Sequence, residues 1–264
     1  MSGLAMKSAV VWANASLKGG VGKTTTAATL AHGLALAGNT TLLVDCDVQN
    51  QARVFFDLGI APGLDALLLK SKGLDEVIIP GVRPNLDILQ AGEELSEAAR
   101  EIILKGIAQE KALQKALKPA MSRYDYIILD SSPGWDIILI NVLWLADFVI
   151  TPLLMTILSI ESYAKFLKKI IPIQEEKPGF DVTILLPTLY ERRLKDARTI
   201  LKQLKEMEPG KVGTPIRKTV TVERSPSIGK TIMDSLKSES EPTGVLLDYL
   251  ELINKVIEVS RNGR

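Results

Sequence analysis

Short apolar runs alternate with longer amphipathic stretches along most of the chain. The short runs are rich in Val, Ile and Leu, which is typical of strands in a covered sheet. Six of them predict strands, which are Ala9–Ala15, Leu42–Asp45, Leu86–Gln90, Tyr126–Asp130, Phe148–Leu153 and Val182–Leu186.

The stretches between these runs carry apolar residues at helical spacing. They predict helices at Lys23–Leu36, Glu94–Ala116, Ile137–Leu145, Glu161–Ile170 and Asp196–Glu206. A last helix is predicted from about Pro242, a favoured first-turn residue, to about Val259. Alternation of strands and helices produces right-handed βαβ units. We therefore expect an α/β fold with one mostly parallel, twisted sheet, helices on both faces, and a ligand beyond the carboxyl ends of the strands.

Length and composition are those of one globular domain. The chain has 264 residues, near the upper limit for one hydrophobic core, and its 46% apolar and 24% charged residues are ordinary values. No stretch rich in Pro, Gly or Ser marks a linker. We expect a single domain over residues 1–264, with residues 1–7 and 261–264 disordered.

A single cysteine, Cys46, limits the chemistry. It excludes an internal disulfide and any cysteine-rich zinc or iron–sulfur site built within one subunit. A reducing compartment fits best, so we expect a cytoplasmic protein.

Two segments resemble export or membrane signals but fit them poorly. The run Ala9–Ala13 and the Ala-Asn-Ala triplet at its end are similar to a signal peptide, yet the run is too short, and cleavage would remove the first strand. The apolar stretch Ile137–Met155 is interrupted by Asn141, Asp147 and Pro152, which favours a buried helix followed by a strand. The last predicted helix has a polar face more acidic than basic, unlike membrane anchors. We expect no membrane partner.

A glycine-rich segment joins the first predicted strand to the first predicted helix. It consists of Lys18, Gly19, Gly20, Val21, Gly22, Lys23, Thr24 and Thr25. Such glycines let consecutive backbone N–H groups turn toward one anion, and the helix N-terminus adds partial positive charge. By this pattern Lys23 neutralises the β- and γ-phosphates of a nucleotide, Thr24 offers its hydroxyl to Mg²⁺, and Thr25 reaches the α-phosphate.

The segment departs from the usual pattern G-x-x-x-x-G-K-[ST], because Leu17 occupies the place of the first glycine and Lys18 follows it. With this extra lysine, the sequence KGGVGKTT resembles the deviant Walker A motif of the ParA/MinD ATPases. The resemblance implies that the cofactors are ATP and Mg²⁺ and that ATP binding produces a homodimer. It also implies that Lys18 reaches across the dimer to the other subunit's nucleotide, so that hydrolysis depends on pairing.

A second segment, LLVDCDVQ at residues 42–49, resembles a family motif that ends D-x-D-P-Q, with Val48 in place of the proline. The resemblance implies that Asp47 orients the attacking water and that Asp45 supports the surroundings of Mg²⁺ and phosphate. Helix capping is the alternative role for Asp47. The catalytic residues implied in this way are Lys18, Lys23 and Asp47.

A third segment, YDYIILD at residues 124–130, resembles the Walker B strand of the family. Asp130 is expected to hold Mg²⁺ through a water molecule, because Mg²⁺ gives up its hydration shell reluctantly. Relatives continue D-x-P-P, where this chain has Ser131, Ser132, Pro133 and Gly134. The metal residues implied are Thr24, Asp45 and Asp130.

The resemblance continues into the C-terminal third. Leu186–Arg193 and Thr214–Arg217 resemble stretches that contribute to the adenine pocket in relatives, and Glu223–Lys230 resembles the family's E-A-P-S-x-G-K segment. The nucleotide contacts implied by the first two are Pro187, Thr188 and Arg217.

Charge is unevenly distributed along the chain. The net charge is +1, but residues 190–237 contain twelve Lys or Arg and six Asp or Glu, so this segment carries +6 and leaves −5 for the remainder. Asymmetry of this kind suggests nucleic acid, because phosphate contacts add together. In relatives that bind double-stranded DNA without sequence preference, such residues form a surface across the dimer. The candidates are Arg192, Arg193, Arg198, Lys202, Lys205, Arg217, Lys218, Arg224 and Lys230.

Three functions are compatible with these motifs. The leading interpretation is a ParA-type ATPase for DNA partition or cargo positioning, which is associated with the nucleoid and whose slow hydrolysis is stimulated by a ParB-like or other cargo adaptor. A MinD-like membrane-associated ATPase is the alternative within the family, although the last helix lacks a basic amphipathic anchor. The third is a module that binds ATP without hydrolysing it. The presence of Asp47 argues against this function.

Overall fold

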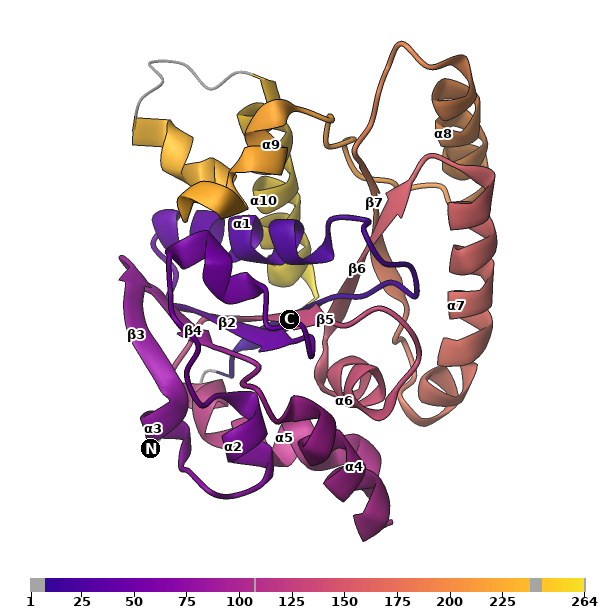
Figure 1. Ribbon diagram of the computed structural model, residues 1–264. Coiled ribbons are helices and arrows are strands. Elements are labelled where there is room, and N and C mark those ends of the chain that lie inside the picture. Colours follow the sequence, from indigo (N-terminus) through magenta and orange to yellow (C-terminus); the bar gives the residue numbers. More distant parts are fainter. Residues whose placement is uncertain (1–7, 107, 238–243, 264) are drawn as a thin grey trace, which may run out of the picture.

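A seven-stranded sheet forms the centre of the molecule in the computed structural model, which describes residues 8–106, 108–237 and 244–263 (Figure 1). The strand order is β3-β4-β2-β5-β1-β6-β7, and all neighbours are parallel except β3 and β4. The strands are β1 (Val10–Asn14), β2 (Thr41–Cys46), β3 (Ile78–Arg83), β4 (Leu86–Leu89), β5 (Tyr126–Ser131), β6 (Phe148–Leu154) and β7 (Val182–Thr188). The predicted α/β fold is confirmed.

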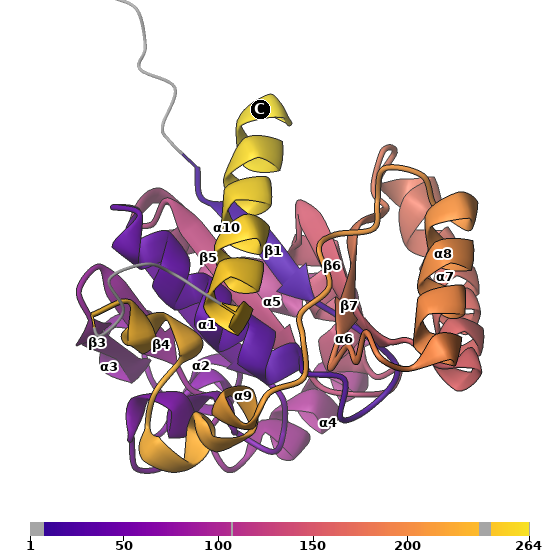
Figure 2. The ribbon, with the colours of Figure 1, turned by 90° about the horizontal axis from the view of Figure 1, so that it is seen from above.

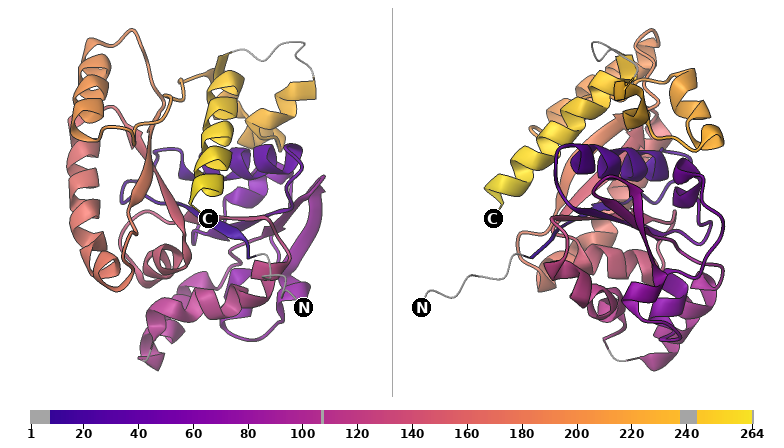
Figure 3. Two further views of the ribbon diagram at one scale, coloured as in Figure 1. Left: turned by 180° about the vertical axis from the view of Figure 1, so that it is seen from behind. Right: turned by 90° about the vertical axis from the view of Figure 1, so that its left-hand side faces the viewer.

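Helices cover both faces of the sheet, as Figure 3 shows. One face packs against α1 (Lys23–Leu36), α9 (Val220–Arg224) and α10 (Gly244–Asn262). The opposite face packs against α2 (Leu64–Leu68), α3 (Leu74–Val77), α4 (Leu95–Lys105), α5 (Ala112–Leu117), α6 (Ile137–Leu145), α7 (Ile157–Glu176) and α8 (Lys195–Met207). Helices α7 and α8 lie side by side (Figures 1 and 2), and the Tyr163 hydroxyl of α7 donates to Glu208 Oε1 just beyond α8 (3.0 Å).

Strand β1 shows how the alternation of side chains builds two cores. Val10 and Trp12 belong to the core beneath α1 and α10, whereas Val11 and Ala13 belong to the core on the other face. Trp12 stacks on Phe148 of β6 with ring centroids 4.7 Å apart. Because both faces of β1 are buried, the strand is apolar throughout except for its last residue.

Most predicted elements are present, and the bounds of α1 and α6 match the prediction. The single helix predicted over Glu94–Ala116 is wrong, because α4 ends at Lys105 and the next residue, Gly106, has a φ of 71°, which an α-helix does not allow. Strand β3 was not predicted, because it contains Pro80 and Gly81, residues that disfavour strands. Helices α2 and α3 have five and four residues and are too short to show a helical period.

The C-terminal helix is longer than expected. It continues to Asn262, so it includes Arg261 and Asn262 of the end that was expected to be disordered. The reason is that Ser260 is buried and accepts a hydrogen bond from Trp12 Nε1 (2.9 Å), which fixes the last turn to β1. Residues 1–7 and 264, and the predicted start of this helix at Pro242, lie outside the described residues. Among the helices of the described part, none combines the length and the apolar character that crossing a membrane requires.

The Trp12–Ser260 hydrogen bond yields a stability prediction. Ser260→Ala should lower the free energy of unfolding by about 1–2 kcal/mol, because it leaves a buried indole N–H without an acceptor. Urea denaturation of the nucleotide-free protein measures this, with Ser227→Ala as the control, since the Ser227 hydroxyl bond is exposed. Equal losses in the two variants would contradict a stabilising role for the Trp12 contact.

Candidate nucleotide-binding site

The loop between β1 and α1 has the backbone of an anion cradle. Gly20 and Gly22 have φ values of 69° and 83°, a left-handed conformation that residues with a Cβ rarely adopt. Gly22 is the N-cap of α1, and its carbonyl accepts the first helical hydrogen bond from Thr26 N (2.9 Å). The free N–H groups of the first turn of α1 therefore face the loop, where an anion is stabilised.

Lys23 is the cation inside this cradle. Its side chain is largely buried, and Nζ donates to the carbonyl of Lys18 (3.2 Å), which closes the loop. Burial lowers the pKa of Lys23, and the carboxylates of Asp130 and Asp47 partly oppose this shift. A buried ammonium next to two carboxylates is ready to pair with a multiply charged phosphate.

Asp130 lies at the end of β5 and is completely buried. Within the described residues, neither carboxylate oxygen has a hydrogen-bond partner. Burial, followed by the charge of Asp45, raises the pKa of Asp130 well above its ordinary value, while the nearby Thr24 hydroxyl and Lys23 lower it in part. A cation would remove this penalty, and a hydroxyl beside a carboxylate is the oxygen donor set that Mg²⁺ prefers.

Asp45 and Asp47 have different surroundings. Both oxygens of Asp45 accept backbone N–H groups, Oδ1 from Asp47 (2.9 Å) and Oδ2 from Ala52 (2.9 Å), so its carboxylate holds the loop after β2. Burial raises the pKa of Asp45 to about 7. Asp47 lines the pocket, and its Oδ1 accepts from Gln49 N (3.0 Å). Both Asp45 oxygens are thus bound to the loop that carries Asp47, and the support of the Mg²⁺ surroundings by Asp45 stays a prediction.

A pocket of about 420 Å³ extends from the loop. Its phosphate end is formed by Gly19, Gly20, Gly22, Lys23, Thr24, Thr25, Asp47 and Pro133. Its other walls are Gln49, Gln51, Thr188, Leu189, Ile216, Val222, Glu223, Pro226 and Tyr249. The apolar members of this second set form a surface on which a flat base can lie.

The structure separates the three residues predicted at the adenine end. Thr188 lines the pocket, and its hydroxyl donates to the carbonyl of Val21 in the glycine loop (2.8 Å). Pro187 lies outside the lining and accepts from Ile216 N (2.8 Å). Arg217 also lies outside it, with its guanidinium bound to both oxygens of buried Asp248 (2.7 Å each).

Several lining residues were not predicted. Pro226 belongs to the segment that resembles E-A-P-S-x-G-K, so that resemblance could have placed it in the pocket. Tyr249 could not have been found from the sequence, because it comes from the middle of α10, where it continues an apolar helical stripe.

Lys18 differs from Lys23 in its position. It is absent from the pocket lining, and its Nζ donates to Ser159 Oγ in the first turn of α7 (3.1 Å). Ser159 Oγ is in turn 3.0 Å from the hydroxyl of Thr156, the N-cap of α7. The loop therefore directs one lysine into its own pocket and the other away from it.

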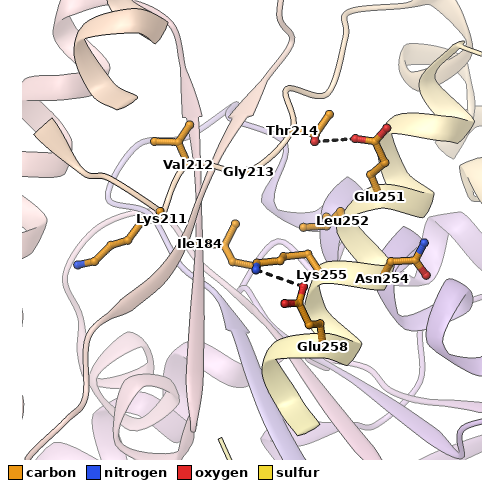
Figure 4. Close-up of a pocket in the computed structure, with 11 residues that line it drawn as sticks. Ile184, Lys211, Val212, Gly213, Thr214, Glu251, Leu252, Asn254, Lys255 and Glu258 are labelled. Atoms are coloured by element: carbon orange, nitrogen blue, oxygen red, sulfur yellow. Dashed lines mark hydrogen bonds and ion pairs between the residues drawn. The ribbon is translucent and has the colours of Figure 1, made fainter. Parts of the chain in front are cut away.

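A second hollow lies between β7, the segment 210–214 and α10 (Figure 4). Four of its polar side chains pair with one another, because Lys255 Nζ donates to Glu258 Oε2 (3.3 Å) and Thr214 Oγ1 to Glu251 Oε2 (2.7 Å). None of its lining residues lies in the first turn of a helix, where free N–H groups would receive a phosphate. The nucleotide site is therefore assigned to the pocket at Lys23.

Comparisons with known proteins agree with this geometry. A family model described as an AAA domain matches residues 9–182. The chain is 30% identical to the chromosome partitioning protein ParA of Myxococcus xanthus, over 82% of this chain and 78% of that protein. The chain belongs to the ParA-like P-loop ATPases.

Solved structures show the same fold. McdA of Cyanothece, as an aspartate-to-alanine variant in complex with ATP, superposes with a TM-score of 0.82 at 22% identity over 97% of both chains. Cobyrinic acid a,c-diamide synthase of Mycobacterium smegmatis, with an ATP analogue and magnesium bound, has a TM-score of 0.80 at 24% identity, also over 97% of both chains. These similarities establish the arrangement of strands and helices that surrounds the loop.

The basic candidates of this ParA-like chain are all exposed. Arg198, Lys202 and Lys205 follow one another on α8 at spacings of four and three residues, which places them on one face, opposite the buried Ala197 and Leu204. Lys195 shares this face and was not among the candidates. Not all of these charges are free, because Glu191 pairs with Arg193 (2.8 Å) and Lys218 (3.7 Å). Five of the candidates have no ion-pair partner among the described residues, namely Arg192, Arg198, Lys205, Arg224 and Lys230.

The Thr188 contact yields a binding prediction. Thr188→Val keeps the shape of the side chain but removes the hydrogen bond that fixes the glycine loop, so the affinity for ATP should fall roughly tenfold. Titration with a fluorescent ATP analogue measures this. Thr199→Val is the control, since the Thr199 hydroxyl is exposed and bonds within α8. Unchanged affinity in Thr188→Val would mean that the loop keeps its shape without this bond.

Proposed function

We propose that the protein is an ATP-driven switch for DNA partition or cargo positioning, which pairs with a second copy when it binds Mg-ATP. The observation that carries this proposal is the different position of two lysines in one loop. Lys23 lies inside the pocket, whereas Lys18 lies outside it, bound to Ser159 in the first turn of α7. A cation in that position completes a nucleotide site only when a second molecule brings its own nucleotide close to it.

The surface around Lys18 suits such pairing. Ile157 and Leu158, in the same turn of α7 as Ser159, are 69% and 67% exposed, and Val48, next to Asp47, is 43% exposed. Large apolar side chains around a polar site are typical of surfaces that become buried in a complex. The proposed partner at this face is a second copy of the chain.

The chemistry proposed for each subunit is ATP hydrolysis to ADP and phosphate. The residues that would hold Mg²⁺ are Thr24, through its hydroxyl, and Asp130, and the ion would supply neutralisation of phosphate charge. The loop N–H groups and Lys23 orient the phosphates, and Asp47, anchored by Gln49, orients the attacking water. Turnover is slow in the isolated chain because the cation of Lys18 arrives only with the second subunit.

We further propose that the ATP-bound dimer binds double-stranded DNA without sequence preference in the cytoplasm, at the nucleoid. The support is the row of exposed basic residues on α8 and the neighbouring arginines without partners. The name of the Myxococcus xanthus relative, a chromosome partitioning protein, supports a role in partition. We propose in addition a ParB-like or other cargo adaptor that stimulates hydrolysis. Phosphate contacts from two subunits would add together.

The different positions of Lys18 and Lys23 yield a prediction about dimer formation. Lys18→Ala should keep the affinity for an ATP analogue but lose dimer formation, and its phosphate release should fall about tenfold or more. Light scattering with a non-hydrolysable analogue and Mg²⁺ measures the dimer. Lys23→Ala is the matched control and should lose nucleotide binding itself. A wild-type chain that stays monomeric with saturating analogue would refute the switch. Phosphate release that never exceeds background, even with DNA and adaptor present, would mean that the protein binds ATP without hydrolysing it.

The basic face yields a prediction about DNA. The double change Arg198→Ala and Lys205→Ala should reduce the slope of log affinity against log salt by roughly two per subunit, because each phosphate contact that is lost leaves about one counterion on the DNA. Fluorescence anisotropy with a DNA duplex at several salt concentrations measures the slope. The double change Arg193→Ala and Lys218→Ala is the control, since both charges are already paired with Glu191. Equal slopes for the two double variants would argue against α8 as the contact face.

A further inference from the structure

Asn14, the last residue of β1, is a polar side chain at the end of an otherwise apolar strand, and it is 0% exposed. Among the described residues, neither its Nδ2 nor its Oδ1 has a hydrogen-bond partner. Burying an amide without hydrogen bonds destabilises a fold, whereas an apolar residue of the same size would not. The position therefore needs an explanation other than packing.

The strand register identifies what lies beside Asn14. Its partner in β5 is Asp130, and its partner in β6 is Ile150. Side chains alternate along β1, so Asn14 points to the same face as Trp12, the face that α1 covers. Of the two neighbours in register, Asp130 is the polar one, and it points to this face because it alternates in the same way with Ile128.

Asp45 of β2 is also in register with Asp130, on the side of β5 that faces away from β1. Asp45 does not serve as a partner for Asn14, because both of its oxygens hold the loop after β2. The carboxylate of Asp130, in contrast, has no partner within the described residues. The backbone of Asn14 is also tied to this segment, since its carbonyl accepts from Ser131 Oγ (2.8 Å). An unpartnered amide and an unpartnered carboxylate thus lie next to each other at the candidate metal site.

We propose that Asn14 is a positioning residue for magnesium, in which its amide orients the Asp130 carboxylate toward the hydrated ion. This inference rests on the proposed binding of Mg-ATP. An amide suits the task because it carries both donors and an acceptor, so it serves a carboxylate through Nδ2 and a metal-bound water through Oδ1. A second carboxylate would add repulsion, and an apolar side chain would leave Asp130 without support.

The proposal and a purely structural role predict different results for Asn14→Leu, a change that keeps the branching at Cγ and removes the polar atoms. Without an unpaired amide, the nucleotide-free and metal-free protein should melt about 2–4 °C higher than wild type. The Mg²⁺ concentration that half-saturates binding of a fluorescent ATP analogue should rise about tenfold or more. The affinity for the analogue in EDTA should be unchanged. A structural role would give a lower melting temperature and a wild-type requirement for Mg²⁺.

Thr151→Val is the matched control. Thr151 lies on β6 next to β1, is 1% exposed, and its hydroxyl also lacks a partner among the described residues. It points to the opposite face from Ile150, away from Asp130. Thr151→Val should therefore raise the melting temperature without changing the requirement for Mg²⁺.

The requirement for Mg²⁺ decides the outcome. If Asn14→Leu and Asn14→Val both keep the wild-type half-saturation, Asn14 does not position the metal site. Should the leucine variant fail to fold, the valine variant carries the test alone. A wild-type protein whose nucleotide binding does not respond to Mg²⁺ would instead overturn the proposed function itself, so the two failures can be told apart.

Discussion

The burial of carboxylates at the carboxyl ends of β2 and β5 is the constraint on which the rest of the site depends. Asp45 and Asp130 are completely buried, and burial is the largest cause of the raised pKa of each. The fold compensates for Asp45 with two backbone N–H groups from the loop that it holds. For Asp130 it provides the charge of Lys23 and the hydroxyl of Thr24, which offset the effect of burial on its pKa only in part. The chain thus carries a destabilised carboxylate where a nucleotide-bound cation would relieve it.

The two lysines of the loop sit in different electrostatic surroundings. Lys23 is buried beside Asp130 and Asp47, whose charges offset part of the cost of burying its ammonium even before a phosphate arrives. Lys18 rests on a neutral hydroxyl in the first turn of α7, and the partial positive charge of a helix N-terminus disfavours a cation there. Its contact with Ser159 is therefore easily exchanged for an anion. The two lysines of one loop therefore differ in how firmly each is held in its present position.

Much of the fold and part of the site could be predicted from the sequence, for identifiable reasons. The six parallel strands and α1 have strong periodic patterns, and the residues from Lys18 to Thr25 are adjacent in the chain, so their motif is readable. What could not be predicted depends on packing between distant segments. Tyr249 reaches the pocket from α10, and Arg217 is drawn away from it by Asp248, thirty-one residues later. The orientation of Asn14 also needed the strand register, because sequence alone does not say which strands are neighbours.

The two edges of the sheet are closed in different ways. Along β7, Leu185 exchanges backbone hydrogen bonds with Lys211 and Gly213, so an irregular segment occupies the groups that another strand would use. Along β3, Pro80 offers no N–H, and the pairing with β4 is irregular between Ile79 and Arg83. Extension of the sheet by a strand from another molecule is thereby disfavoured at both margins. The proposed pairing with a second copy would therefore use side-chain surfaces, which can separate again, and not continuous backbone ladders that lock molecules into fibres.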